Sequence, residues 1–184
     1  RTIKNRFGPT SEIALFEMTD RGLREVDNPS AFFMSQYRAG TPGSVIVPVL
    51  EGTRPLLVEI QALVAPAGYG TPQRRVTGTD PQRVAMIIAV LDRRGGLALA
   101  GQDVFVNVVG GISVEEPAAD LGIALAIAGG LLDRKVPPGV LVAGELGLGG
   151  EVRPVHQTDL RLREGRRVGF EAAWMPRGSM KGLG

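Results

Sequence analysis

The sequence predicts an α+β fold in which mixed sheets are packed against helices. Segments with the composition of strands dominate the first half of the chain, and helical segments alternate with strands in the second half. This order is typical of α+β or mixed α/β domains. With 184 residues and a hydrophobic content of 43%, the chain is long and apolar enough to bury one medium-sized core.

Strand-forming segments in the first half are separated by clear turn signals. A turn at 19–22 lies between two short runs of strand formers and predicts a hairpin. Asn28 and Pro29 open a short helical segment that reaches Met34. In the strand predicted at 56–64, Glu59 and Gln61 point to one face of the sheet. The segments expected to form strands are 12–26 (the hairpin), 44–50, 56–64 and 74–78.

The stretch 103–133 organises the rest of the chain. Residues 103–109 are rich in β-branched side chains and have apolar residues on both faces, which predicts a strand buried within a sheet. Gly110-Gly111 allows a turn, and Pro117 suits the first turn of the following helix. That helix, over 118–132, is apolar on almost every face, so we expect it to be buried nearly all round.

Helix and turn signals place the remaining elements. Asp80 followed by Pro81 marks a helix start, and two glycines at 95–96 end that helix. Thr158 or Asp159 is expected to cap a basic helix, which Gly169 stops. The last strands are expected at 140–145, 151–155 (after a glycine-rich turn) and 170–175.

Composition excludes several kinds of chemistry. The chain has no cysteine, so disulfides, thiolate catalysis and cysteine-bound zinc or iron–sulfur clusters are excluded. No apolar run reaches the roughly 20 residues that span a bilayer, so neither a membrane span nor a signal peptide is expected. A formal net charge of +2 does not by itself indicate nucleic-acid binding, so only the local distribution of arginines bears on it.

The residue inventory argues against a hydrolase. Many enzymes mount a nucleophile where a strand leads through a glycine turn into a buried helix, but this chain has Ala118 and Ala119 there. A Ser-His-Asp triad would have to use His156, the only histidine, and its place beside a turn is typical of a surface residue. No lysine lies on a predicted helix or strand where it could face a serine.

Three carboxylates near the start of the central helix raise the question of a metal site. Glu115, Glu116 and Asp120 could form a site of carboxylates alone. Acidic residues at the start of a helix more often favour the helix dipole or cap the helix. No metal site is therefore predicted.

Arginines supply the candidate nucleic-acid contacts. On the predicted basic helix, three arginines at spacings of three and four share one face, and phosphates would be natural partners for them. A solvated helix face, with Glu164 and Asp159 nearby, explains the same pattern equally well. The candidate set is Arg74, Arg75, Arg153, Arg161, Arg163, Arg166 and Arg167.

Three stretches of the chain match a known family. The pentapeptide KNRFG occupies residues 4–8, EGTRPLLVEIQALV occupies 51–64 and QDVFVNVVGG occupies 102–111. In this order they resemble the RadA (Sms) family of bacterial DNA-repair proteins, and the resemblance covers essentially Lys4 to Pro176. The resemblance implies a parent protein with a zinc-binding module, a RecA-like ATPase and a domain similar to the proteolytic domain of Lon.

This resemblance also implies the domain organisation. Residues 1–9 would be the tail of the ATPase domain, 10–177 the Lon-like domain and 178–184 a disordered end. The implied fold is that of the Lon proteolytic domain, also described as ribosomal protein S5 domain 2-like. No cofactor is expected in this chain, since ATP and Mg would belong to the ATPase domain and Zn to the N-terminal module of the full-length protein.

Comparison of this family with the Lon proteases implies that the peptidase activity is lost. Lon uses a serine that follows a proline at the start of a buried helix, and a lysine on the next helix. Matching Pro117 places Ala118 at the serine position, and matching Pro154 and Gly169 places Asp159 at the lysine position. The resemblance therefore implies that this chain has no enzyme activity of its own. The full-length protein is expected to be a DNA-dependent ATPase or helicase.

The function implied by the resemblance is that of a non-proteolytic scaffold. It would form a hexameric ring and contribute to DNA binding during branch migration of recombination intermediates. The implied partners are further copies of the chain, single-stranded DNA, branched intermediates, a recombinase and a replication helicase, in the cytoplasm on the nucleoid and away from membranes. The motif expected to couple ATP to DNA is Lys4, Asn5, Arg6, Phe7 and Gly8.

Two other functions stay open from the residues. A purely structural oligomerisation module would form the ring without contacting DNA. A residual atypical peptidase would depend on His156 or on the pair Glu115 and Glu116.

Overall fold

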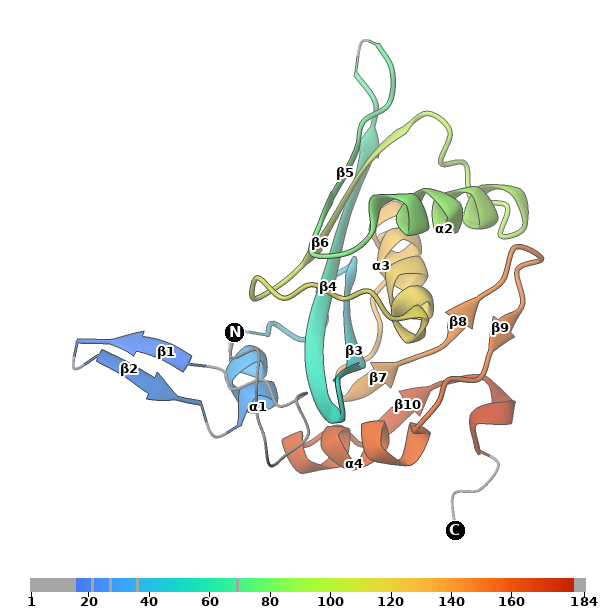
Figure 1. Ribbon diagram of the computed structural model, residues 1–184. Helices are drawn as coiled ribbons and strands as arrows, with labels where there is room; N and C mark the ends of the chain where they lie inside the picture. The colour runs from blue at the N-terminus through green and yellow to red at the C-terminus, as the bar shows by residue number, and fades with distance from the viewer. Residues whose placement is uncertain (1–15, 21, 27, 36, 69, 181–184) are drawn as a thin grey trace.

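The computed structural model describes residues 16–20, 22–26, 28–35, 37–68 and 70–180 (Figure 1). Its helices are α1 (Pro29–Met34), α2 (Pro81–Arg93), α3 (Asp120–Leu132) and α4 (Thr158–Val168), with the 3-10 helices η1 (Pro117–Ala119) and η2 (Arg177–Met180). Its strands are β1 (Phe16–Thr19), β2 (Gly22–Glu25), β3 (Ser44–Glu51), β4 (Arg54–Pro66), β5 (Arg74–Thr77), β6 (Gln102–Val108), β7 (Val140–Val142), β8 (Glu145–Leu146), β9 (Val152–Arg153) and β10 (Ala172–Trp174). This mixed arrangement of strands and packed helices agrees with the predicted class.

A six-stranded mixed sheet with the order β10-β7-β3-β4-β6-β5 forms the centre of the molecule. β4 is antiparallel to both β3 and β6, whereas the pairs β5–β6, β3–β7 and β7–β10 are parallel. The predicted β3–β4 pair forms, with Ser44 opposite Gln61 and Glu51 opposite Arg54. Beyond Gln61, β4 pairs only with β6. Two small hairpins, β1–β2 and β8–β9, complete the strands.

Helices lie on both faces of the central sheet, and each face has its own apolar core. On one face, α2 and α3 cover a large cluster that includes Val47 and Ile60 (Figure 1). On the other face, α1 and α4 lie near a smaller cluster of Ile46, Leu57 and Leu141. Alternate residues of β3 and β4 therefore point into different cores, as the period of a strand requires.

The central strand and helix form where the sequence predicts them, with two differences. The first turn of the apolar helix is the 3-10 helix η1, and α3 begins at Asp120. In β6, Val104 and Val106 are buried, but Phe105 is only half-buried and Asn107 is exposed. The expectation of a strand buried on both faces is therefore wrong for β6, because α1 and α4 pack on β3 and β4 instead.

Capping contacts explain where α2 begins and correct the predicted start of α4. The Asp80 side chain accepts a hydrogen bond from the backbone N–H of Gln82 at 3.0 Å, so Asp80 caps α2 as predicted. α4 instead follows Gln157, which has a left-handed backbone and makes no side-chain cap. Thr158 is already helical and its hydroxyl donates to the carbonyl of Val155 at 3.0 Å, so neither Thr158 nor Asp159 caps the helix.

The chain leaves the central sheet in the middle of the segment predicted as one strand at 140–145. The backbone N–H of Ala143 donates to Trp174 of β10, and that of Gly144 donates to the carbonyl of Ala118 in η1, at 3.1 and 3.0 Å. The backbone thereby passes from β7 to the hairpin strand β8, alongside the start of α3.

The end of the described chain is more regular than predicted. Residues 178–180, assigned from the sequence to a disordered end, belong to η2, while 181–184 lie outside the described residues. The expected tail at 1–9, with its KNRFG motif, also lies outside them. Among the described residues, none of the helices combines the length and the apolar character that a membrane crossing requires.

Candidate functional site

A buried arginine joins α4 to the segment that leads into η1. The Nη1 and Nη2 atoms of Arg161 donate to the two carboxylate oxygens of Glu116 at 2.7 and 2.6 Å. The same guanidinium donates to the carbonyls of Pro48 at 2.6 Å and His156 at 3.0 Å. Glu116 also accepts a hydrogen bond from the backbone N–H of Leu50 at 2.6 Å. Only 3% of the Arg161 side chain is exposed, so this arginine presents no surface to a DNA phosphate.

The two positions that the resemblance matches to the Lon dyad lie near this network along the chain, Ala118 just after Glu116 and Asp159 just before Arg161. Ala118 is buried in η1, and Asp159 is exposed on α4, where it pairs with Arg163 at 2.8 Å. The side chains that connect α4 with the entrance of η1 are Arg161 and Glu116. A methyl group and an ion-paired carboxylate supply neither the hydroxyl nor the amine of a Ser-Lys dyad.

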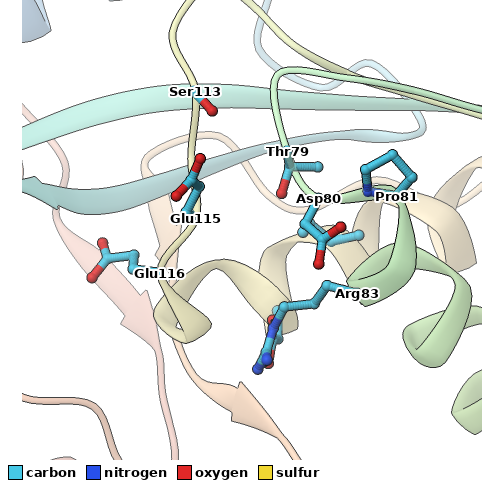
Figure 2. A pocket seen from close by; sticks show the side chains of 9 residues that line it. Thr79, Asp80, Pro81, Arg83, Ser113, Glu115 and Glu116 are labelled. Carbon is cyan, nitrogen blue, oxygen red and sulfur yellow. The ribbon is translucent and has the colours of Figure 1, made fainter.

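A cleft of about 540 Å³ opens beside the starts of α2 and η1 (Figure 2). Figure 2 shows Asp80 and Arg83 on the α2 side and Glu115 and Glu116 on the segment before η1. The cleft is lined by Thr79, Asp80, Pro81, Arg83, Ser113, Glu115, Glu116, Asp120 and Ile123. Carboxylates outnumber the single arginine, so the electrostatics of this cleft oppose the binding of a phosphate.

Asp120 forms a buried ion pair at the base of the cleft. Its Oδ1 accepts a hydrogen bond from Arg83 Nε at 2.5 Å, and its Oδ2 pairs with Arg83 Nη2. The backbone N–H of Leu146 donates to Oδ2 at 3.0 Å. Hydrogen bonding to Asp120 raises the pKa of the Arg83 guanidinium above its ordinary value. The sequence interpretation of Asp120 as a helix-dipole residue misses this pair, although a lone carboxylate in an apolar helix signals that a partner is required.

The three carboxylates considered for a metal site have different surroundings in the structure. Arg161 holds Glu116 and Arg83 holds Asp120, while Glu115 is exposed. Within the described part of the chain, no group of three or more aspartate, glutamate or histidine side chains is placed to hold a metal ion. His156 is exposed, as predicted for a turn residue, and its carbonyl accepts a hydrogen bond from Arg161.

The two arginines of β5 point to opposite faces of the sheet. Arg74 donates to the carbonyls of Gln102 and Leu99, the latter at 2.8 Å, and so anchors the segment that precedes β6. Arg75 donates from Nε to the side-chain oxygen of Gln73 at 3.1 Å and is exposed. β5 is an edge strand at the opposite end of the sheet from β10, so these arginines are separate from those of α4.

Most of the other candidate arginines pair with neighbouring carboxylates. Arg153 binds Glu151 at 2.5 Å, and Arg163 binds Asp159 one helical turn away. Arg166 is exposed on α4, and no ion pair to it is found within the described residues. The candidate set therefore does not form one continuous basic patch.

Arg167 and Glu164 form an ion pair within α4 in which the carboxylate is buried and the guanidinium is half-exposed. Arg167 donates from Nε and Nη2 to Glu164 at 2.9 and 2.6 Å and also to Asn28 at 2.8 Å. Burial by itself raises the pKa of the Glu164 carboxyl, but hydrogen bonds from Arg167 and Ser30 hold that pKa below its ordinary value. The pair thus ties α4 to the start of α1.

We expect Glu164→Gln to lower the free energy of unfolding by about 1 kcal/mol at pH 7, and by less at pH 3. A carboxyl whose pKa is lowered in the folded state contributes stability above its unfolded pKa of about 4.3, and this contribution is lost as the pH falls through the folded pKa. Urea unfolding at both pH values measures the effect, with the exposed Glu171→Gln as the control. An equal loss at pH 7 and pH 3 would contradict the assignment.

Comparisons with known proteins identify the family. No protein-family model matches the chain. The chain is 54% identical over 177 residues to DNA repair protein RadA of Aquifex aeolicus, covering 96% of this chain and 40% of that protein. It is 51% identical over 176 residues to DNA repair protein RadA of Escherichia coli, covering 96% of this chain and 38% of that protein. The chain thus spans about two fifths of the length of these relatives, and it belongs to the family of DNA repair protein RadA.

Proposed function

We propose that this chain is a non-proteolytic, Lon-like scaffold domain of a RadA-type DNA repair protein. It forms a hexameric ring and contributes to DNA binding during branch migration of recombination intermediates. The whole protein is proposed to be a DNA-dependent ATPase that uses ATP and Mg, carries Zn in a separate module, and works with a recombinase and a replication helicase on the nucleoid in the cytoplasm.

The observation that carries the proposal is the match to DNA repair proteins along 96% of the chain. The strand, glycine turn and buried helix formed by β6 and α3 support a Lon-like architecture. Ala118 and Asp159 at the positions of the Lon dyad support a scaffold rather than a peptidase. The exposed arginines of α4 support contact with an anionic polymer.

The mass of the chain in solution, with and without single-stranded DNA, tests both parts of this proposal. We expect a hexamer that binds DNA more weakly as salt rises. Arg163→Ala with Arg166→Ala should flatten the slope of log K against log salt by about 0.7 for each phosphate that the variant no longer neutralises. Arg38→Ala with Arg177→Ala, which removes the same charge elsewhere, is the matched control. A monomer without DNA binding at low salt would refute the proposal.

A scaffold without DNA contact is the second candidate, and the ion pairs of the arginines favour it. Arg161 is buried, and Arg153, Arg163 and Arg167 each pair with a carboxylate of this chain. An arginine that is paired with a carboxylate must give up this partner to bind a phosphate, and this lowers the free energy gained from phosphate binding. This candidate predicts the same hexamer but no salt-dependent DNA binding.

A further inference from the structure

One half of a sheet face is left without a covering helix in the described chain. α2 and α3 pack on one face, and α1 and α4 pack on the other at β3 and the first half of β4 (Figure 1). Next to the loop at 41–43, the second half of β4 forms a shallow concave surface with β6 and β5, of about 560 Å³. We call this surface the open face, and its side chains are Gln61, Leu63, Arg75, Thr77, Phe105 and Asn107.

The strand register sorts these side chains into two rows. Phe105 of β6 lies between Leu63 of β4 and Arg75 of β5. The second row, one step along the strands, consists of Gln61, Asn107 and Thr77. The open face therefore has an aromatic ring on its middle strand, with a cation on one side and a row of amide and hydroxyl groups beside it.

The apolar part of the open face is partly exposed to water among the described residues. Leu63 is 65% exposed and Phe105 is half-buried, whereas Val104 and Val106 point into the core on the other side of β6. A partly exposed aromatic ring beside an exposed leucine on three paired strands is a surface that a planar ligand can cover.

The carboxylate of Glu59, at the margin of the open face, already accepts hydrogen bonds within this chain. Glu59 is buried and accepts hydrogen bonds from Ser44 Oγ at 2.6 Å and from Gln61 Nε2 at 2.9 Å. The Gln61 amide is held in place by this bond, and its carbonyl oxygen is left as an acceptor for a ligand.

The guanidinium of Arg75, on the open face, forms no ion pair with the described residues. Among the described residues, the Arg75 side chain makes one hydrogen bond, from Nε to the side chain of Gln73, and no carboxylate pairs with it. The neighbouring Asp103 accepts a hydrogen bond from the backbone N–H of Gln73 at 2.7 Å. Arg75 is therefore the one charged side chain among the six that line the open face, and it is the group there that can pair with an anion.

We propose that the open face binds single-stranded nucleic acid, with a base stacked on Phe105 and a neighbouring phosphate paired with Arg75. Stacking on an aromatic side chain beside a cation is how single strands are held without sequence preference, because every base has a flat face. The row of Gln61, Asn107 and Thr77 offers hydrogen bonds to base edges. This inference rests on the proposed DNA contact, and it assigns that contact to a surface separate from α4.

Binding of fluorescein-labelled oligo-dT, followed by anisotropy, tests the assignment. Phe105→Leu keeps an apolar side chain but removes the ring, and we expect it to weaken binding about 5- to 150-fold, the range for loss of one base stack. Arg75→Ala should weaken binding and reduce the salt slope by about 0.7. Arg38→Ala is the control for loss of one positive charge. Unchanged affinity in both open-face variants would overturn the inference.

A tryptophan placed on the open face gives a direct readout of stacking. Trp174 is the only tryptophan of the chain and lies on β10, so Trp174→Phe combined with Phe105→Trp leaves one reporter on the open face. Oligo-dT should quench its fluorescence at the concentrations at which anisotropy detects binding. Binding without quenching would refute the open face while leaving the proposed DNA contact intact, and absence of binding by the unchanged chain would refute both. If Phe105→Leu alters the oligomer mass instead, the open face is a contact between copies and the inference is wrong.

Discussion

Replacing Asp120 by alanine is expected to lower the free energy of unfolding by about 3 kcal/mol or more. The Asp120 side chain is fully buried, and it accepts hydrogen bonds from Arg83 and from the backbone N–H of Leu146. The alanine variant leaves that N–H buried without an acceptor and leaves Arg83 without its counter-charge. Because 27% of the Arg83 side chain is exposed, water relieves part of the cost, which places the effect toward the lower end for a broken buried pair.

Urea unfolding followed by circular dichroism measures this loss. Asp120→Asn keeps an oxygen that can accept from Leu146 but removes the charge, so it should cost less than the alanine variant. Asp159→Ala, at an exposed carboxylate of α4, should change stability by no more than about 0.5 kcal/mol. An Asp120→Ala variant within that same margin would show that the pair contributes little.

Arg161→Met should cost about 3 kcal/mol, the second large effect. The substitution removes the two bonds to Glu116 and leaves the carbonyls of Pro48 and His156 without their donor. Arg161→Lys retains the charge but not the planar, forked donor, so we expect it to recover only part of the loss. Arg163→Met, exposed on the same helix, is the matched control.

A double-mutant cycle separates the ion pair from the rest of this network. Glu116→Gln should be destabilising by itself, and it should add less than its full effect in the Arg161→Met background because the pair is already broken. Strictly additive losses would mean that Arg161 acts through the backbone carbonyls rather than through Glu116. Unfolding in urea of the two single variants and the double variant provides the three values.

These two ion pairs lie around the segment that the proposed Lon-like alignment matches to the nucleophile position of a Lon peptidase. Arg161 and Glu116 fix α4 to that segment, and Arg83 and Asp120 fix α2 and β8 to the helix that follows it. Both pairs hold the helices in place and neither supplies a reacting group. The arrangement favours a rigid scaffold, as the proposed function requires.

Several parts of the fold follow from short-range signals. The β3–β4 pair, the hairpin β1–β2 in its described residues and the start of α2 at Asp80 form where the sequence predicts them. Each depends on the alternation of apolar residues, a turn or a cap within a few residues, so local sequence is enough. Ala118 at the start of the central helix likewise needs no structure to be recognised as lacking a nucleophile.

The partners of charged side chains could not be predicted in this way. Arg161 and Glu116 are 45 residues apart in the chain, and Arg83 and Asp120 are 37 apart, so only the packing of α4 and α2 brings them together. Sequence therefore placed Arg161 among candidates for DNA contact, although the folded chain buries it.

The order of strands and helices and the alanines at the start of the central helix can be recognised from the chain alone, because both depend on residue type and local periodicity. Which arginines reach the surface, and which half of a sheet face stays uncovered, is settled only when the chain folds. Both depend on which helix packs on which strands, and that packing is set by contacts between residues far apart in the chain.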